Sequence, residues 1–148
     1  VKSDCIGGKG GANWESAPSP RQFLRGVKYK VSGSGCVGGI KAVFQGPSGD
    51  VDGGGGGQAV SETLVGRPGY VVGGMIARGT DRVNAFKLVF VKVSGPRLVM
   101  SDRYESEWVG KRAGGTDVRM GDDGTPVVGL YGRAGGEVDA LGLIFQGK

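Results

Sequence analysis

Apolar and polar residues alternate along much of the chain with a period of two. Val27, Tyr29 and Val31, for example, alternate with two lysines. The same pattern occupies residues 40–44, 86–93 and 141–145. Because successive side chains of a strand point to opposite faces, this pattern predicts strands with one buried face. No stretch shows the period of an amphipathic helix, and segments rich in Gly, Asp, Ser or Pro separate the strands, so the predicted fold class is all-β.

The strand pattern occurs three times. Segments 37–44, 83–90 and 138–145 align without a gap and each ends in Phe. The preceding segments 28–32, 74–78 and 129–133 align at the same spacing, also without a gap. A Gly-Gly step stands about 30 residues before each final Phe, at 10–11, 56–57 and 114–115. The sequence therefore predicts one domain, 1–148, with repeats at approximately 1–46, 47–94 and 95–148.

Repeats of this length hold about four strands each, too few to bury a core alone. We expect one four-stranded Greek-key sheet per repeat, with the three sheets packed around a shared core in pseudo-threefold symmetry. A β-propeller is the rival architecture, but three blades fall below the usual number. Three sheets around a common axis form a prism.

Composition excludes several classes of function. The 148 residues include 33 Gly but also 38% hydrophobic residues, so the chain has enough apolar side chains for a core. It has no His, which removes His-based nucleophilic systems and His-ligated zinc. Two cysteines are too few for an all-cysteine zinc site. Cys5 and Cys36 could form one disulfide or both be small buried apolar residues, and both alternatives stay open.

The net charge of +5 raises the question of a nucleic-acid partner. The basic residues are spread over predicted turns and strand faces and form no tract, which favours a solvated surface and no nucleic-acid binding. No apolar run is long enough to span a membrane. Because the chain begins with Val1, we expect a processed protein or part of a longer multidomain chain. An extracellular or secreted location is favoured over others, and a homo-oligomer stays an alternative.

Two motifs resemble those of one known family. Residues 125–143 read TPVVGLYGRAGGEVDALGL, which is similar to the C-terminal signature of the jacalin-related lectins. Residues 6–11 read IGGKGG and resemble the W-G-G-x-G-G opening of the same family, with Ile6 where Trp is usual. With the repeats, the resemblance covers essentially the whole chain. It implies the β-prism I fold and metal-free binding of mannose, glucose or galactose, with no cofactor.

The resemblance also implies which residues touch sugar. The family's G-x-x-x-D loop corresponds to Gly135, Gly136, Glu137, Val138 and Asp139, and its Gly-Gly loop to Gly10 and Gly11. In the family, backbone N–H groups and the Asp carboxylate bind hydroxyls along one edge of a hexose. This chemistry is sound, since a carboxylate accepts two hydroxyl donors and N–H groups donate to the sugar oxygens. An ordinary turn capped by its Asp would have the same sequence.

The other two copies differ at the position of Asp139. The second copy has Asn84 there, within a loop that includes Asp81 and Arg82, and this set is a candidate second site. The first copy has Gly38, which offers no acceptor side chain, so no site is expected there. Carbohydrate binding is thus expected of the third copy above all.

The function predicted from these observations is binding of a mono- or oligosaccharide without catalysis. A mannose or glucose preference is favoured, because galactose-type members often use a free N-terminal Gly made by cleavage, and nothing here resembles that. The alternative is a β-prism structural or protein-interaction module without sugar binding. An enzyme would require two carboxylates that face each other across a cleft.

Overall fold

The computed structural model describes residues 1–112 and 114–147, and these residues form thirteen strands and no helix. The first sheet contains β3 (Leu24–Val31), β4 (Val37–Gly46), β5 (Gly49–Gly57) and β6 (Glu62–Val65). The second contains β7 (Tyr70–Gly79), β8 (Val83–Ser94), β9 (Arg97–Glu105), β10 (Val109–Gly110) and β11 (Asp117–Gly121). The third contains β1 (Ile6–Gly7), β2 (Ala12–Ser16), β12 (Val127–Ala134) and β13 (Val138–Phe145). The all-β prediction is confirmed.

Each sheet is an antiparallel Greek key. The strand orders are β5-β4-β3-β6, β10-β8-β7-β11 with β9 also on β8, and β1-β13-β12-β2. In the first two sheets, three consecutive strands lie side by side and a later strand returns to pair with the first; in the third, β1 lies beside β13 and β2 beside β12 to give the same order. β9 and β10 pair with successive parts of β8 and together take the place of one edge strand. The three Greek-key sheets predicted from the repeats are therefore present.

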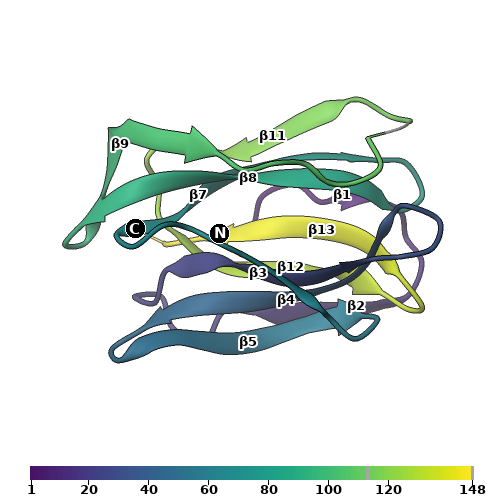
Figure 1. Ribbon diagram of the computed structural model, residues 1–148, viewed down its shortest axis with the longest axis horizontal. Helices are drawn as coiled ribbons and strands as arrows, with labels where there is room; N and C mark the ends of the chain where they lie inside the picture. The colour runs from purple at the N-terminus through teal and green to yellow at the C-terminus, as the bar shows by residue number, and fades with distance from the viewer. Residues whose placement is uncertain (113, 148) are drawn as a thin grey trace.

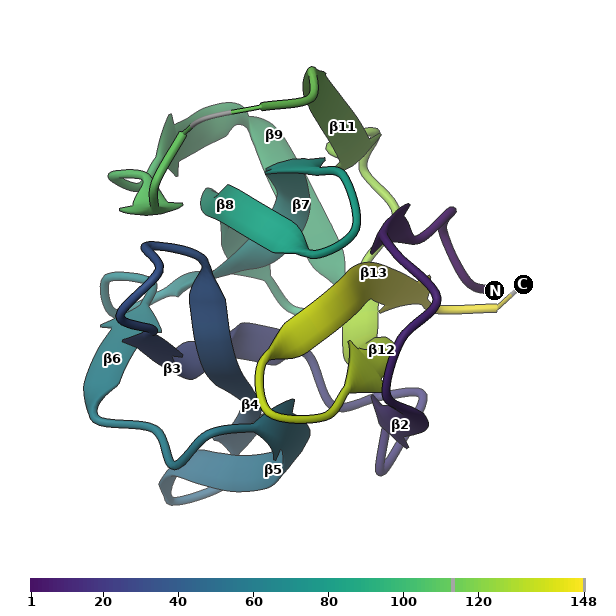
Figure 2. The same cartoon turned by 90° about the vertical axis from the view of Figure 1, so that its right-hand side faces the viewer.

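The third sheet is built from both ends of the chain. β12 and β13 are the last strands, and β1 and β2 complete the Greek key from the N-terminal side. The termini lie side by side (Figure 2), where the Phe145 amide donates to the Val1 carbonyl at 2.7 Å. The sheets are therefore offset from the repeats 1–46, 47–94 and 95–148. The first sheet spans residues 24–65 and the second spans residues 70–121. This arrangement brings the loop after β1 beside the loop before β13.

The three sheets enclose one core. Their long strands run along the long axis of the molecule (Figure 1), and the view along this axis shows the sheets surrounding a shared interior (Figure 2). Equivalent positions on β3, β7 and β12, namely Val27, Met75 and Leu130, are fully buried in one cluster. Phe44 and Phe90 belong to the same buried cluster. Burial of these side chains is the main force that holds the sheets together.

The first hairpin differs from the other two in length. Val31 pairs with Val37 in the first sheet, whereas Gly79 pairs with Val83 and Ala134 with Val138. The β3–β4 loop thus has two more residues than its counterparts. The ungapped alignment of 37–44 with the other copies is correct, but that of 28–32 is wrong by two residues. Strand alternation cannot reveal this, because a shift by two keeps every side chain on the same face.

One Gly-Gly step also has a different place from that expected. Gly57 pairs with Gly39 on β4, as Gly7 pairs with Ala140 on β13 and Gly110 with Ala85 on β8. The step at 56–57 is therefore the counterpart of 6–7 and not of 10–11. In the first sheet the chain continues from Gly57 through Gln58 without a second Gly-Gly step.

Candidate functional site

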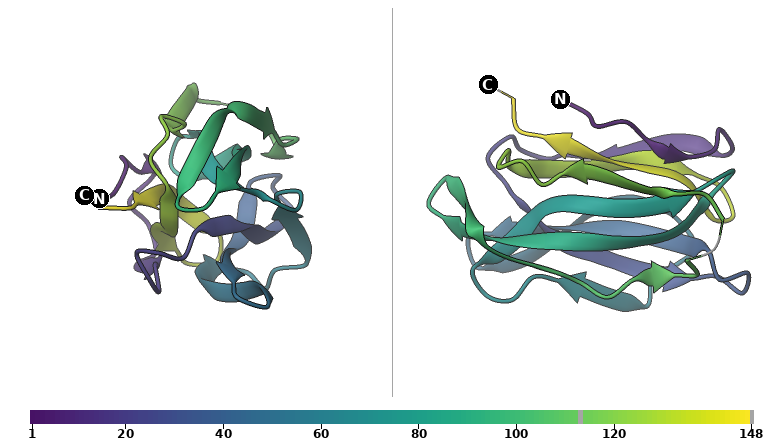
Figure 3. Two further views of the ribbon diagram at one scale, coloured as in Figure 1. Left: turned by 90° about the vertical axis from the view of Figure 1, so that its left-hand side faces the viewer. Right: turned by 90° about the horizontal axis from the view of Figure 1, so that it is seen from above.

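Hairpin loops from all three sheets meet at one end of the prism. The β12–β13 loop and the loop between β1 and β2 lie at the end that faces the viewer in Figure 2, and the termini lie toward the opposite end seen on the left of Figure 3. The β3–β4 and β7–β8 loops come to the same end. This end contains the residues that the sequence singled out.

The carboxylate of Asp139 packs directly against the backbone of the β1–β2 loop. A Cβ on Gly10 would lie 3.3 Å from Cγ of Asp139, and one on Gly11 would lie 2.6 Å from Oδ2. Gly11 also has φ of +69°, in the left-handed region. The Gly8 amide donates to the Asp139 carbonyl at 2.7 Å and fixes the loop beside β13. Glycine at 10 and 11 therefore lets backbone approach this carboxylate as no larger residue could.

Arg133 holds the β1–β2 loop in this position. Its Nε donates to the Gly10 carbonyl at 3.1 Å and its Nη2 to the Gly11 carbonyl at 2.8 Å. Its Nη1 donates to Oδ1 of Asn13 at 2.6 Å. One planar guanidinium thus binds three acceptors and sets the orientation of the two glycine peptides. Sequence reasoning missed this residue, although the G-R step of the C-terminal signature contains it.

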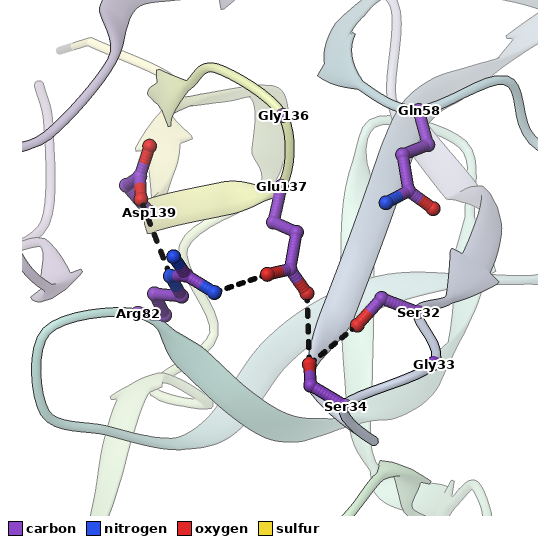
Figure 4. A pocket seen from close by; sticks show the side chains of 8 residues that line it. All are labelled: Ser32, Gly33, Ser34, Gln58, Arg82, Gly136, Glu137 and Asp139. Atoms are coloured by element: carbon purple, nitrogen blue, oxygen red, sulfur yellow. Dashed lines mark hydrogen bonds and ion pairs between the residues drawn. The ribbon is translucent and has the colours of Figure 1, made fainter.

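A polar pocket of about 350 Å³ lies beside Asp139 and between the sheets (Figure 4). We call it the inter-sheet pocket; its lining residues are Ser32, Gly33, Ser34, Gln58, Arg82, Gly136, Glu137 and Asp139. The first sheet supplies four of these residues, the second sheet Arg82, and the third sheet the rest. Nearly all of the lining side chains can donate or accept hydrogen bonds.

A chain of polar contacts crosses this pocket. The Arg82 guanidinium lies between two carboxylates: its Nη1 pairs with Glu137, and its Nε is 4.0 Å from Oδ1 of Asp139. Ser34 Oγ donates to the other Glu137 oxygen at 2.9 Å, and Ser32 Oγ lies 2.7 Å from Ser34 Oγ. Hydrogen bonding from Ser32 and Ser34, together with the Arg82 charge, lowers the pKa of Glu137 despite its partial burial.

The structure brings the predicted residues of the third copy together. Gly10, Gly11 and Asp139 are in contact, and Gly135 and Gly136 form the exposed tip of the facing loop. The Val138 side chain is fully buried, so only its backbone is available to a ligand. The Glu137 side chain points toward Ser34 and Arg82 and takes part in the inter-sheet pocket.

The candidate second site is dispersed. Asp81 packs through its backbone against Gly8, and Arg82 extends into the inter-sheet pocket. Asn84 accepts a hydrogen bond from Sγ of Cys36 at 3.6 Å. A Cβ on Gly114 would lie 3.2 Å from Nδ2 of Asn84, so the glycine contact of the third sheet has a counterpart here. The three residues Asp81, Arg82 and Asn84 therefore face three different surroundings.

In the first sheet a side chain fills the place of the acid. A Cβ on Gly38 would lie 2.6 Å from Oε1 of Gln58, so the Gln58 amide occupies the space beside this glycine. Cys5 and Cys36 are both free thiols, Cys5 exposed and Cys36 partly buried, so they form no disulfide and are not two buried apolar residues either.

Two features are absent from the described residues. Within 1–112 and 114–147, no group of three or more Cys, Asp or Glu side chains is placed to hold a metal ion. In the same residues no helix is long and apolar enough to cross a membrane.

No protein-family model matches the sequence, and no curated protein matches it either. Solved structures do match. The Malaysian banana lectin has a TM-score of 0.71 at 17% identity, with 100% of this chain and 99% of that chain covered. A mannose-binding jacalin-related lectin from Ananas comosus has a TM-score of 0.69 at 18% identity, covering 100% and 98%. The mannose-binding lectin from champedak has a TM-score of 0.68 at 17% identity, covering 98% and 95%. The chain therefore has the β-prism fold of the jacalin-related lectins, as the two sequence motifs implied.

Proposed function

We propose that this protein is a lectin that binds a hexose of a mono- or oligosaccharide between the β1–β2 loop and the β12–β13 loop. The observation that carries the proposal is the Asp139 carboxylate, which is packed against the Gly10–Gly11 backbone at the end of the prism. A carboxylate next to exposed glycine backbone combines strong acceptors with N–H donors in one small space. This is the combination that the vicinal hydroxyls of a sugar require.

Each residue has a distinct part in the proposed site. Asp139 accepts two sugar hydroxyls, and backbone N–H groups of the 135–139 loop donate to sugar oxygens. Gly11 supplies a further N–H from the opposite loop, whose carbonyls are bound by Arg133 and so point away from the ligand. Because Arg133 and the Gly8 amide already hold this loop, little conformational entropy is lost when a sugar binds.

The kind of sugar is proposed from the structural neighbours. Lectins from champedak and Ananas comosus with this fold are mannose-binding, and artocarpin with the same fold has been solved with mannotriose. We therefore expect mannose or glucose to bind more tightly than galactose. The open inter-sheet pocket beside Asp139 supports a binding site over a purely structural module, whose loop would be covered.

Binding without catalysis is also part of the proposal. Glu137 and Asp139 both line the inter-sheet pocket, so they are the pair of carboxylates that a glycosidase mechanism would need. A general acid in such an enzyme requires a raised pKa, whereas the serine hydroxyls and Arg82 lower the pKa of Glu137. Arg82 also lies between the two groups and pairs with Glu137.

A glycan array tests the proposal. The wild-type chain should bind mannose- or glucose-terminated glycans, the Asp139→Ala variant should lose this binding, and chelators should have no effect. Asn84→Ala is the matched control at the equivalent position of the second sheet, and it should bind as the wild type does. Equal signals from the wild type and Asp139→Ala would refute the assignment of this site.

A further inference from the structure

The β12–β13 loop has little of its own structure to hold its tip. The tip consists of two glycines and Glu137, and among the residues that the structure describes no atom lies within 4 Å of where a Cβ on Gly136 would stand. One turn hydrogen bond, from the Gly135 amide to the Glu137 carbonyl at 3.0 Å, closes the loop. Glycine gains the most backbone freedom when a segment is released, so an untethered loop of this composition would sample many conformations.

The Glu137 side chain connects this tip to both other sheets. One carboxylate oxygen pairs with Arg82 of the β7–β8 loop, and the other accepts a hydrogen bond from Ser34 of the β3–β4 loop at 2.9 Å. Ser32 supports Ser34 from behind through the 2.7 Å contact of their hydroxyls. The Glu137 side chain is 15% exposed, whereas Arg82 is 51% exposed. The pairing is thus sheltered at the carboxylate, where charge-assisted hydrogen bonds are stronger than on an open surface.

We infer that the Glu137 side chain is a positioning group for the proposed sugar site, and that Arg82 and Ser34 act on the site through it. The inference rests on the proposed function and deepens it. Glu137 keeps the backbone of 135–139 in the conformation that a sugar needs, although its own carboxylate faces away from the Gly10–Gly11 loop. The site on the third sheet therefore depends on side chains of the first and second sheets.

This arrangement regulates the site through ionic strength. A neutral sugar gains or loses no charge on binding, so its affinity would normally change little with salt. Salt screens an ion pair whose arginine is half exposed, and the tether then weakens. We expect the affinity for a neutral sugar to fall as salt rises, and this dependence to disappear in the Arg82→Ala variant.

The test is a double-mutant cycle with methyl α-mannopyranoside, measured by calorimetry. Arg82→Ala and Glu137→Gln should each weaken binding about two- to fivefold, the range of an exposed or half-exposed ion pair. The double variant should be no weaker than the worse single variant, because both changes remove the same contact. Glu15→Gln, which removes the exposed Lys2–Glu15 pair from the same sheet, is the matched control and should bind as the wild type does.

Amide hydrogen exchange in the absence of sugar separates this inference from the proposed function. The Gly135 amide should exchange about two- to fivefold faster in Arg82→Ala and Glu137→Gln than in the wild type and Glu15→Gln, because the same contact is lost. If neither the wild type nor any variant binds the mannoside but amide exchange changes as expected, the proposed function fails. The role of Glu137 in holding the loop then still stands. If Asp139→Ala alone abolishes binding while Arg82→Ala binds as tightly as the wild type or more tightly, and exchange is unchanged, the tether is overturned.

Discussion

Oδ2 of Asp139 lies 2.6 Å from the place where a Cβ on Gly11 would stand, so the carboxylate and the glycine backbone are in direct contact. The two residues are at opposite ends of the chain and meet because β1 and β13 pair in one sheet. The proposed sugar site is therefore formed only after the N-terminal segment has docked onto the C-terminal hairpin.

Gly11→Ala is expected to weaken sugar binding by at least about tenfold. The methyl group would overlap the Asp139 carboxylate, and alanine at φ of +69° adds backbone strain of about 1–2 kcal/mol. Gly54→Ala is the matched control, because its Cβ would be at an ordinary 3.6 Å from Ser16 and its φ is not left-handed. Calorimetric titration with mannose measures the difference, and an undiminished affinity in Gly11→Ala would contradict the contact.

Arg133→Ala should lower the affinity for sugar clearly while it changes the thermal stability of the fold only slightly. The variant frees the carbonyls of Gly10 and Gly11, so the β1–β2 loop must be ordered again at each binding event. We expect about a tenfold loss of affinity, with a thermal midpoint within a few degrees of the wild type.

Arg78→Ala is the control for that variant. Arg78 pairs with Ala85 on β8 as Arg133 pairs with Ala140 on β13, but its guanidinium binds the Asp117 carboxylate. Its loss should leave sugar affinity unchanged. Equal losses in the two variants would mean that Arg133 acts only on general stability.

The stoichiometry of binding should be one hexose per chain. In the first sheet Gln58 fills the space beside Gly38. In the second sheet the Arg82 side chain extends into the inter-sheet pocket and does not join Asn84 in a second site. Titration to saturation counts the sites directly. A second site of similar affinity that is lost in Asn84→Ala would show that the second sheet binds sugar as well.

Acid should remove the stabilisation that Glu137 provides. Its pKa in the folded protein lies below the ordinary 4.5, because Ser32, Ser34 and Arg82 favour the charged form. The stabilisation is thus complete above pH 4.5 and is lost as the pH falls through the lowered folded value. The wild type should melt at a higher temperature than Glu137→Gln at pH 7, and the difference between the two melting temperatures should shrink as the pH falls below 4.5. A gap that is constant with pH would argue against an ionised Glu137 in the folded state.

Much of the fold could be predicted from the sequence. Alternation at Val27, Tyr29 and Val31 predicts a strand with one buried face. The three copies that end in Phe44, Phe90 and Phe145 predict three sheets. The length of the β3–β4 loop could not be predicted, because a shift by two residues leaves alternation intact. The offset of sheets and repeats could not be predicted either, because no local pattern indicates that β1 pairs with β13 and β2 with β12.

The candidate site was predicted in part. Motif resemblance pointed to Asp139 and Gly11, and the structure places them in contact. The direction of the Arg82 side chain depends on which loops meet at the end of the prism, so its sequence position suggested only a place in a second site with Asp81 and Asn84. Gln58 gave no signal in the sequence, because its importance comes only from the space beside Gly38 that its side chain fills.

The most direct test of the central claim is a titration of mannose into the wild type and the Asp139→Asn variant, at the same pH and salt. Asparagine keeps the shape of the side chain but replaces one acceptor oxygen by an NH2 donor, so it cannot accept a sugar hydroxyl at each of its two terminal atoms. We predict one site per chain in the wild type and a loss of at least about a hundredfold in affinity in Asp139→Asn, with an unchanged thermal midpoint. Equal affinities in the two proteins would contradict the account.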